Sequence, residues 1–226
     1  MYSGFRELDE MLGNLGKGEL TIVAGRPGMG KTALCWSMAA RISQEKNSVA
    51  MIVNHEGAFY GGINPVKHYG TAKQNFHVWI DNFDIRMLEN TLKHIHECLV
   101  LDILFIPHLF PLNQAETKFV TNTIKEYAVA TGTHCVLEYN ITRRPEKRTN
   151  KRPSIDDILC PNTVRNNANN ILLVFRDEYY NSDITDPIFE VIVAKASSGE
   201  LGTAHLKVLY EHIEISQTIP KVYNRN

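Results

Sequence analysis

The stretch Gly25-Arg26-Pro27-Gly28-Met29-Gly30-Lys31-Thr32 follows the pattern G-x-x-x-x-G-K-T, and it decides what fold the chain can adopt. An apolar, β-branched run precedes it at Leu20–Ala24, and a run rich in helix formers follows it at Ala33–Ala40. A strand, a glycine-rich turn and a helix start, in this order, point several backbone N–H groups at one place, where the helix dipole also favours negative charge. The pattern therefore predicts a phosphate-binding P-loop that holds a nucleoside triphosphate.

Within this loop, the residue types indicate separate roles. Lys31 can reach the β- and γ-phosphates, and the Thr32 hydroxyl can ligate Mg²⁺. The alternative is a chance match in a glycine-rich loop, which the flanking strand and helix disfavour. The predicted nucleotide-binding residues are Gly25, Arg26, Pro27, Gly28, Met29, Gly30, Lys31, Thr32 and Ala33.

Length and composition exclude several classes of protein. The 226 residues suit one large α/β domain, and a net charge of −1 means that any nucleic-acid contact must be local. The four cysteines lack C-x-x-C spacing, which is typical of free thiols in a reducing compartment. The longest apolar run, Cys98 to Pro107, is too short to span a bilayer, and the N-terminus lacks the features of a signal peptide. We expect a cytoplasmic protein with no membrane partner.

Strand-like and helix-like stretches alternate along the chain, which predicts a mostly parallel, twisted sheet flanked by helices, with a β-rich C-terminal third. We expect one domain over residues 1–216 and a loose tail over 217–226. The expected strands after the P-loop are Ser48–Asn54, His77–Ile80, Cys98–Phe105, His134–Tyr139, Ile171–Phe175, Phe189–Ala194 and Thr203–Tyr210. The expected helices are Asp84–Glu97, Gln114–Thr131 with a terminating Gly132, and a short one near Ile155–Leu159.

The run Cys98-Leu99-Val100-Leu101-Asp102 presents one carboxylate after four apolar residues. A buried strand that ends in an aspartate is the Walker B arrangement, in which the carboxylate supports Mg²⁺ through water. We therefore predict that Asp102 supports the metal. The alternative is an acidic residue at an ordinary strand end.

Hydrolysis also needs a group that orients and deprotonates the attacking water. The residue after Asp102 is Ile103, so the base must come from elsewhere. Glu56, just beyond the strand that ends near Val53, is the candidate base, and a solvated loop carboxylate is the alternative. Asn140 ends another strand, where its amide could sense the γ-phosphate.

A basic run lies between residues 143 and 152, with six cationic side chains and one acidic one. Such side chains can follow a single-stranded phosphate backbone, although a solvated surface loop is the alternative. The candidate nucleic-acid-binding residues are Arg143, Arg144, Lys147, Arg148, Lys151 and Arg152.

Taken in order, these motifs resemble RecA-like ATPases and, more closely, the C-terminal motor domain of DnaB-type replicative hexameric helicases. The resemblance also involves Ser3–Asp9, Lys151–Pro153, Val174–Glu178 and Val193–Lys195, and it extends over essentially the whole chain. It implies ATP and Mg²⁺ as cofactors, single-stranded DNA as a partner, a hexameric ring, and a primase or loader as a further partner.

The resemblance also implies roles for individual residues. Lys31 and Thr32 would bind phosphate and metal, Asp102 would support the metal, Glu56 would be the base, and Asn140 would replace the family's sensor glutamine. Arg176 would lie near the nucleotide, and Lys195 would act on the γ-phosphate of the neighbouring subunit.

Three departures from the family pattern stand against this interpretation. Ser197 occupies the position of the arginine finger, whose contribution is roughly 10³–10⁵ in rate where it has been measured. Cys160-Pro161-Asn162 replaces a charged stretch of the DNA-contacting loop. The sequence before Leu20 leaves no room for the family's N-terminal domain and linker helix. The short interval between Glu56 and Asp102 suggests a trimmed viral or mobile-element version acting in a host cytoplasm, and an excised domain of a longer protein is the alternative.

Two other functions remain open at this stage. The chain could be a non-translocating RecA-like ATPase that serves as a nucleotide-dependent assembly or regulatory module, which the Ser197 and Cys160-Pro161-Asn162 departures favour. A small-molecule kinase is the weaker option, because the β-rich last third does not suggest a basic lid over a second substrate.

Overall fold

The P-loop joins the strand β1 (Leu20–Gly25) to the helix α2 (Lys31–Gln44), as the sequence predicts. The computed structural model describes residues 1–53, 75–80, 84–106, 113–197, 199–209 and 214–217. β1 is buried at all six positions because it lies inside the sheet, between β5 (His134–Asn140) and β6 (Asn170–Arg176). The loop therefore starts from the centre of the sheet.

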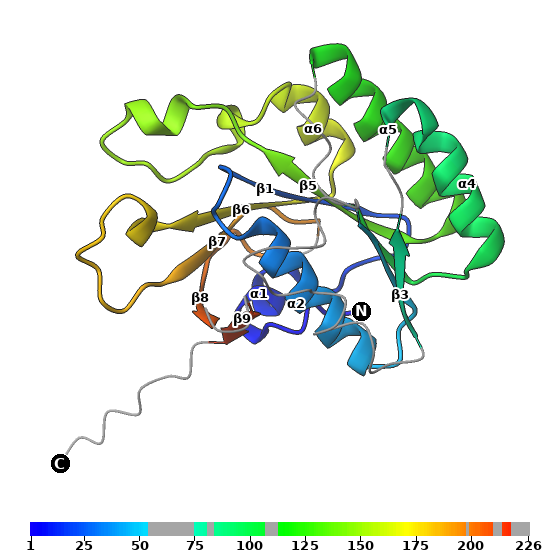
Figure 1. Cartoon of the computed structure of the whole chain (residues 1–226), viewed down its shortest axis with the longest axis horizontal. Helices are drawn as coiled ribbons and strands as arrows, with labels where there is room; N and C mark the ends of the chain where they lie inside the picture. The colour runs from blue at the N-terminus through cyan, green and yellow to red at the C-terminus, as the bar shows by residue number, and fades with distance from the viewer. Residues whose placement is uncertain (54–74, 81–83, 107–112, 198, 210–213, 218–226) are drawn as a thin grey trace.

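The nine strands in the described part of the chain form one sheet, in the order β3-β2-β4-β5-β1-β6-β7-β8-β9 (Figure 1). The six from β3 to β6 in this order are parallel, so their carboxyl ends meet at one edge, and β7, β8 and β9 extend the sheet antiparallel. The remaining strands are β2 (Val49–Val53), β3 (Phe76–Ile80), β4 (Ile103–Ile106), β7 (Phe189–Lys195), β8 (Gly202–Leu209) and β9 (Glu214–Gln217).

Helices cover both faces of the sheet (Figure 1). Val23 of β1 packs into the core on the side of α1 (Arg6–Leu12) and α2, whereas its neighbours Ile22 and Ala24 pack into the opposite core. That second core lies beneath α4 (Leu88–Cys98), α5 (Gln114–Thr131) and α6 (Pro161–Asn167). Successive side chains of a strand point to opposite faces, so alternate residues of each strand enter the same core.

The helix α5 has the boundaries predicted from the sequence, and its ends explain why. Asn113 accepts a hydrogen bond from the Glu116 backbone N–H, and Glu116 accepts one from the Asn113 N–H, which makes a capping box. Gly132 terminates the helix in the left-handed conformation, with φ of 71°. Short 3₁₀ turns occur at η1 (Ile85–Met87), η2 (Arg144–Lys147), η3 (Ile155–Asp157) and η4 (Asp177–Tyr179).

Only the last part of the strand predicted at Cys98–Phe105 is a strand in the structure. α4 continues to Cys98, Val100 is 90% exposed, and β4 begins only at Ile103. The apolar run therefore contains a helix end and a connection before the strand, a distinction that continuous apolarity does not reveal.

Other elements also depart from expectation. The sequence pattern did not predict α1, α6 or β9, and the helix expected near Ile155–Leu159 is the shorter turn η3. The irregular stretch expected between Gly57 and Gly70 lies outside the described residues. Within the described residues, none of the helices combines the length and the apolar character needed to cross a bilayer.

Candidate nucleotide site

The glycines of the P-loop shape the start of α2. Gly30, the N-cap, has a φ of 93°, and a Cβ there would lie 2.7 Å from Cε2 of Phe189. Gly28 also has a positive φ, of 79°. L-residues with side chains rarely adopt this conformation, so glycine at both positions allows the turn that leads into the helix. The first amides of α2 have no partner within the helix and face the carboxyl edge of the sheet, which is the arrangement that binds anions.

Lys31 is buried at the first position of α2. Its ammonium Nζ donates a hydrogen bond of 3.2 Å to the backbone oxygen of Arg26, so the side chain folds back over the loop. Burial lowers the pKa of Lys31 below its usual value, and the nearby Glu138 carboxylate partly offsets this effect. Because the Glu138 charge only partly offsets the cost of burying the Lys31 ammonium, this cation is suited to bind an anionic ligand.

Thr32 points to a carboxylate that the sequence interpretation did not single out. Its hydroxyl Oγ1 donates a hydrogen bond of 2.7 Å to Oε2 of Glu138, in the middle of β5. Burial raises the pKa of Glu138, while the Thr32 hydroxyl, the Lys31 charge and the Cys35 thiol oppose that rise. The sequence did carry a sign of this residue, because Glu138 is the one acidic residue in the otherwise apolar run from Cys135 to Tyr139.

Two other predicted residues reach the same edge of the sheet. Asn140 is the last residue of β5 and pairs with Gly25, the first residue of the P-loop. Arg176 is the last residue of β6, and its Nε lies 3.1 Å from Oε1 of Glu178 in a mostly buried ion pair. The structure therefore brings Lys31, Thr32, Asn140 and Arg176 to one edge.

Asp102 is not at that edge, so its predicted role at the metal is wrong. It precedes β4 and lies at the amino edge of the sheet, where its Oδ2 accepts a hydrogen bond of 2.8 Å from the Ser48 N–H. Its own N–H donates to the Ser48 oxygen. Asp102 thus fixes the chain entry into β4, at the end of the strand away from the P-loop. The predicted base, Glu56, lies outside the described residues.

Lys195 also lies at the amino edge, because β7 runs antiparallel and Lys195 pairs with Ile171 near the start of β6. Its Nζ donates to the backbone oxygens of Arg165 and Ala168, at 2.7 and 2.6 Å, where α6 ends. Lys195 therefore does not serve the nucleotide site of its own chain. A contact with a neighbouring subunit stays a prediction.

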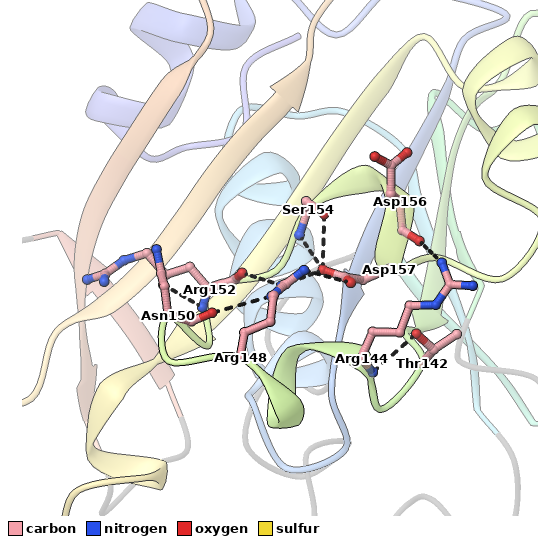
Figure 2. A network of polar contacts seen from close by, with 8 residues as sticks. All are labelled: Thr142, Arg144, Arg148, Asn150, Arg152, Ser154, Asp156 and Asp157. Carbon is pink, nitrogen blue, oxygen red and sulfur yellow. Dashed lines mark hydrogen bonds and ion pairs between the residues drawn. The ribbon is translucent and has the colours of Figure 1, made fainter.

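The predicted basic run forms a structured loop rather than a free one (Figure 2). Arg148 makes a two-pronged contact with the buried Asp157, at 3.1 and 2.7 Å, and also donates to the Arg152 backbone oxygen. Arg152 pairs with Glu190 and lies over the ring of Phe175, with its Cζ 5.0 Å from the ring centroid. Arg148 and Arg152 are thus engaged within the protein.

The other cations of the run differ in how firmly they are held. Lys151 donates to the backbone oxygens of Glu146 and Arg148, and Arg144 donates to that of Asp156. Among the described residues, the exposed side chains of Arg143 and Lys147 make no hydrogen bond or ion pair. These two cations are the members of the run most available to an outside ligand.

The P-loop and the basic loop contact each other directly. Arg26 lies with its NH2 nitrogen 2.7 Å from Oε1 of Glu146, and its Nε donates to the same oxygen at 2.8 Å. Arg26 also donates to the backbone oxygen of Ile141 at 3.3 Å. Glu146 is the acidic member of the basic run, so the two loops share an ion pair.

Comparison with known proteins agrees with this geometry. A family model described as the DnaB-like helicase C terminal domain matches residues 1–58 and 67–217. A probable replicative DNA helicase of Trieres chinensis is 27% identical over 248 residues, which cover 91% of this chain and 54% of the relative. The replicative DNA helicase DnaB of Geobacillus stearothermophilus is 26% identical over 252 residues, with 93% and 55% covered. The chain thus spans about half the length of these relatives.

Solved structures show the same fold. One described as an ATPase domain superposes with a TM-score of 0.80 at 20% identity, and the match covers 96% of this chain and 90% of that one. A DnaB-like replicative helicase, described together with its interactions with primase, gives a TM-score of 0.77 at 20% identity, with 96% and 61% covered. The fold is therefore that of a RecA-like ATPase domain, as the sequence predicts.

Proposed function

Because this chain belongs to the family of DnaB-like helicase C-terminal domains, we propose that it is an ATP-hydrolysing motor domain that moves along single-stranded DNA during replication. The observation that carries this proposal is the P-loop, with Lys31 and Thr32 at the carboxyl edge of a RecA-like sheet. Nucleotides bind at this edge in open α/β sheets, beside the strand where the order reverses.

The nucleotide would be ATP with Mg²⁺. The amides that open α2 and the Lys31 ammonium would hold its phosphates, and the Thr32 hydroxyl would supply a protein oxygen to the metal. Mg²⁺ at phosphate sites takes only one or two protein ligands, so Thr32 with phosphate and water oxygens suits it. When bound, the ion would supply positive charge that stabilises the phosphates during hydrolysis. Asn140 would contact the γ-phosphate, Arg176 would lie near the nucleotide, and Glu56 remains the proposed base.

Single-stranded DNA would meet the basic loop through Arg143 and Lys147, whose side chains are exposed. Arg144 adds a third cation beside a pocket of about 300 Å³, which is also lined by Thr142, Leu159 and Cys160. Arg148 and Arg152 would instead hold the loop in shape. Phosphate contacts by such side chains give affinity without sequence preference.

The domain would act as a ring, proposed here as a hexamer, in which Lys195 approaches the nucleotide of the next subunit. Its present contacts with the end of α6 would have to open for that to happen. A primase or a loader is the proposed partner, by analogy with the relative described together with primase. This role would place the protein in the cytoplasm.

The rival function is a nucleotide-dependent assembly or regulatory module that does not translocate. Ser197, in place of the arginine expected from the resemblance, favours this rival, because a finger stabilises transition-state charge from the neighbouring subunit.

The test is the rate of ATP hydrolysis with and without a single-stranded oligonucleotide. A motor should be stimulated by DNA, and Lys31→Ala should abolish both nucleotide binding and turnover. Lys17→Ala removes an exposed lysine as a matched control and should behave as the wild type. A wild-type rate that DNA leaves unchanged would support the rival. Undiminished ATP affinity in Lys31→Ala would overturn the nucleotide site itself.

A further inference from the structure

The carboxylate that should assist the metal is missing from its expected strand. β4 ends at Ile106, and the sequence from Ile103 to Leu112 contains neither aspartate nor glutamate. Asp102, the acidic residue before this stretch, is held by Ser48 at the opposite edge of the sheet. The carboxylate that assists the metal must therefore come from another element.

Glu138 stands in a position to supply it. Leu137 pairs with Ile106, the last residue of β4, so Glu138 lies one residue further toward the carboxyl edge, on the strand next to β4. Glu138 also pairs with Val23 of β1, two residues before the P-loop begins at Gly25. Val23 and Val136 both enter the core on the α2 side. Side chains two residues apart on a strand point to the same face, so Glu138, which follows Val136 by two residues, also points toward α2.

The contact with Thr32 leaves the right atoms for a metal. A threonine hydroxyl has one proton and two lone pairs. When Thr32 donates its proton to Glu138, the lone pairs of Oγ1 remain free to ligate a cation. A carboxylate that accepts a hydrogen bond from a metal ligand orients that ligand and raises its basicity.

Burying the Glu138 carboxylate costs free energy, and no structural role of this side chain offsets the cost. Glu138 is 3% exposed, in a strand whose other buried members include Cys135, Val136 and Leu137. Strands covered on both faces ordinarily carry apolar side chains, and a carboxylate there must be compensated by partners. Its partners belong to the P-loop and α2, namely Lys31, Thr32 and Cys35. A buried acid whose charged and hydroxyl partners, Lys31 and Thr32, both belong to the P-loop indicates a functional site.

We propose that Glu138 is the outer-sphere carboxylate of the Mg²⁺–ATP site, where it orients Thr32 toward the metal in place of an acid at the end of β4. Glu138 is thus a positioning residue that acts through Thr32. The inference rests on the proposed nucleotide site and adds a residue to it.

The experiment measures metal affinity rather than turnover. Mn²⁺ is titrated into the protein bound to a non-hydrolysable ATP analogue, and its binding is followed by electron paramagnetic resonance. Glu138→Gln keeps the size and the acceptor oxygen for Thr32 but removes the charge. We expect it to weaken Mn²⁺ binding by about 10-fold or more, the range found when such supporting groups are removed. Binding of the analogue in the presence of EDTA should not weaken, because a negative charge beside the phosphates is lost.

Two controls make the outcome decisive. Asp102→Asn removes the carboxylate at the other edge of the sheet and should leave Mn²⁺ affinity unchanged. Glu138→Asp keeps the charge and should bind Mn²⁺ more tightly than Glu138→Gln. Wild-type Mn²⁺ affinity in a folded Glu138→Gln protein would overturn the inference while leaving the nucleotide site intact. Failure of the wild type to bind the analogue would instead overturn the proposed function.

Discussion

At the scale of a single residue, His134 shows how a buried polar group is accommodated. Its Nδ1 lies 2.8 Å from the backbone oxygen of Gly16, which can only accept, so Nδ1 carries the proton. A neutral ring then leaves Nε2 to accept from the Thr21 hydroxyl, at 2.9 Å. Burial lowers the pKa of His134 to about 4, with opposing smaller influences from the Gly16 hydrogen bond and Glu19, and Lys125 lowers it further.

This histidine makes stability depend on pH. The unfolded chain binds a proton near pH 6.5, while the folded protein resists it down to about pH 4. The stabilisation is therefore complete above the unfolded pKa and is lost as the pH falls toward the folded pKa. Between pH 7 and pH 5 we expect a loss of about 2 kcal/mol in the free energy of unfolding from His134.

Urea denaturation at the two pH values measures this loss. His134→Gln should be less stable at pH 7 but should lose less on acidification than the wild type does. His94→Gln is the matched control, because it replaces an exposed histidine of α4 and leaves the contacts of His134 intact. An equal pH dependence in wild type and His134→Gln would contradict the prediction.

Residues differ in how well the sequence predicts their place. The P-loop residues and Asn140 are found where the pattern indicates, because their positions follow from a strand and turn of definite length. Asp102 was misplaced because an apolar run does not reveal where its strand begins. Glu138 was missed because the partner that gives it meaning, Thr32, lies 106 positions away in sequence.

At the scale of an element, the basic loop owes its shape to its own charged side chains. Asp157 accepts from Arg148, from the Ser154 N–H at 2.7 Å and from the Ser154 hydroxyl (Figure 2). Burial raises the pKa of Asp157, but these hydrogen bonds more than offset it, so the pKa lies below its usual value. The carboxylate therefore stays charged and anchors the loop.

Two adjacent cations in this loop should respond differently to removal. Arg148→Ala leaves the buried Asp157 without its ion pair, and we expect a loss of about 1–3 kcal/mol in the free energy of unfolding. Lys147→Ala should change stability by less than about 0.5 kcal/mol, because the side chain is exposed and unpaired among the described residues. It should nevertheless weaken single-stranded DNA binding. The slope of the logarithm of the binding constant against the logarithm of the salt concentration should become shallower by about one.

Urea denaturation and fluorescence anisotropy with a labelled oligonucleotide, at several salt concentrations, separate the two effects. Equal destabilisation by both variants would show that the ion pair does not hold the loop. An unchanged salt slope in Lys147→Ala would remove Lys147 from the DNA surface.

Elements with strong local signals were predictable, and others were not. α5 carries a capping pair at its start and a glycine at its end, so its boundaries are encoded locally. α1 and α6 have only seven residues each, and packing against the sheet rather than periodicity holds them in place. The strand predicted over residues 98–105 began too early, because the end of a helix and the start of a strand have similar sequences when both are apolar.

At the scale of the whole molecule, the sheet separates two groups of residues. The P-loop with Thr32 and Glu138 lies at its carboxyl edge, whereas Lys195 and Ser197 lie at its amino edge. The Ser197 N–H donates to Oδ1 of Asn170 at 3.0 Å, and the side chain is exposed. A residue at this edge can act on a nucleotide only in another copy of the chain.

Ser197→Arg tests that arrangement. If copies assemble head to tail, the new guanidinium approaches the neighbouring nucleotide, and we expect hydrolysis to rise by about 10-fold or more, within the range known for arginine fingers. The rise should appear only at protein concentrations where light scattering detects assemblies. Ser182→Arg adds the same charge at an exposed position elsewhere and should have no such effect. An increase at concentrations where the protein is monomeric would contradict action between copies.

The parallel part of the sheet follows from the alternation of strands and helices in the sequence, because strands separated by helices favour parallel pairing. What alternation cannot supply is the order of strands, and hence which polar residues become neighbours across the sheet. Whether several copies assemble is likewise not encoded in any local pattern.

The ion pair between Arg26 and Glu146 has an electrical consequence for the surface beside it. While the pair is closed, an approaching polyanion meets a loop whose one negative charge is cancelled. If phosphates in the P-loop draw Arg26 away, the Glu146 charge is left uncompensated among the cations and would repel the same polyanion. Affinity for a nucleic acid strand would then fall when phosphates occupy the P-loop. Occupation and emptying of the P-loop would therefore alternate with weaker and stronger binding of the strand.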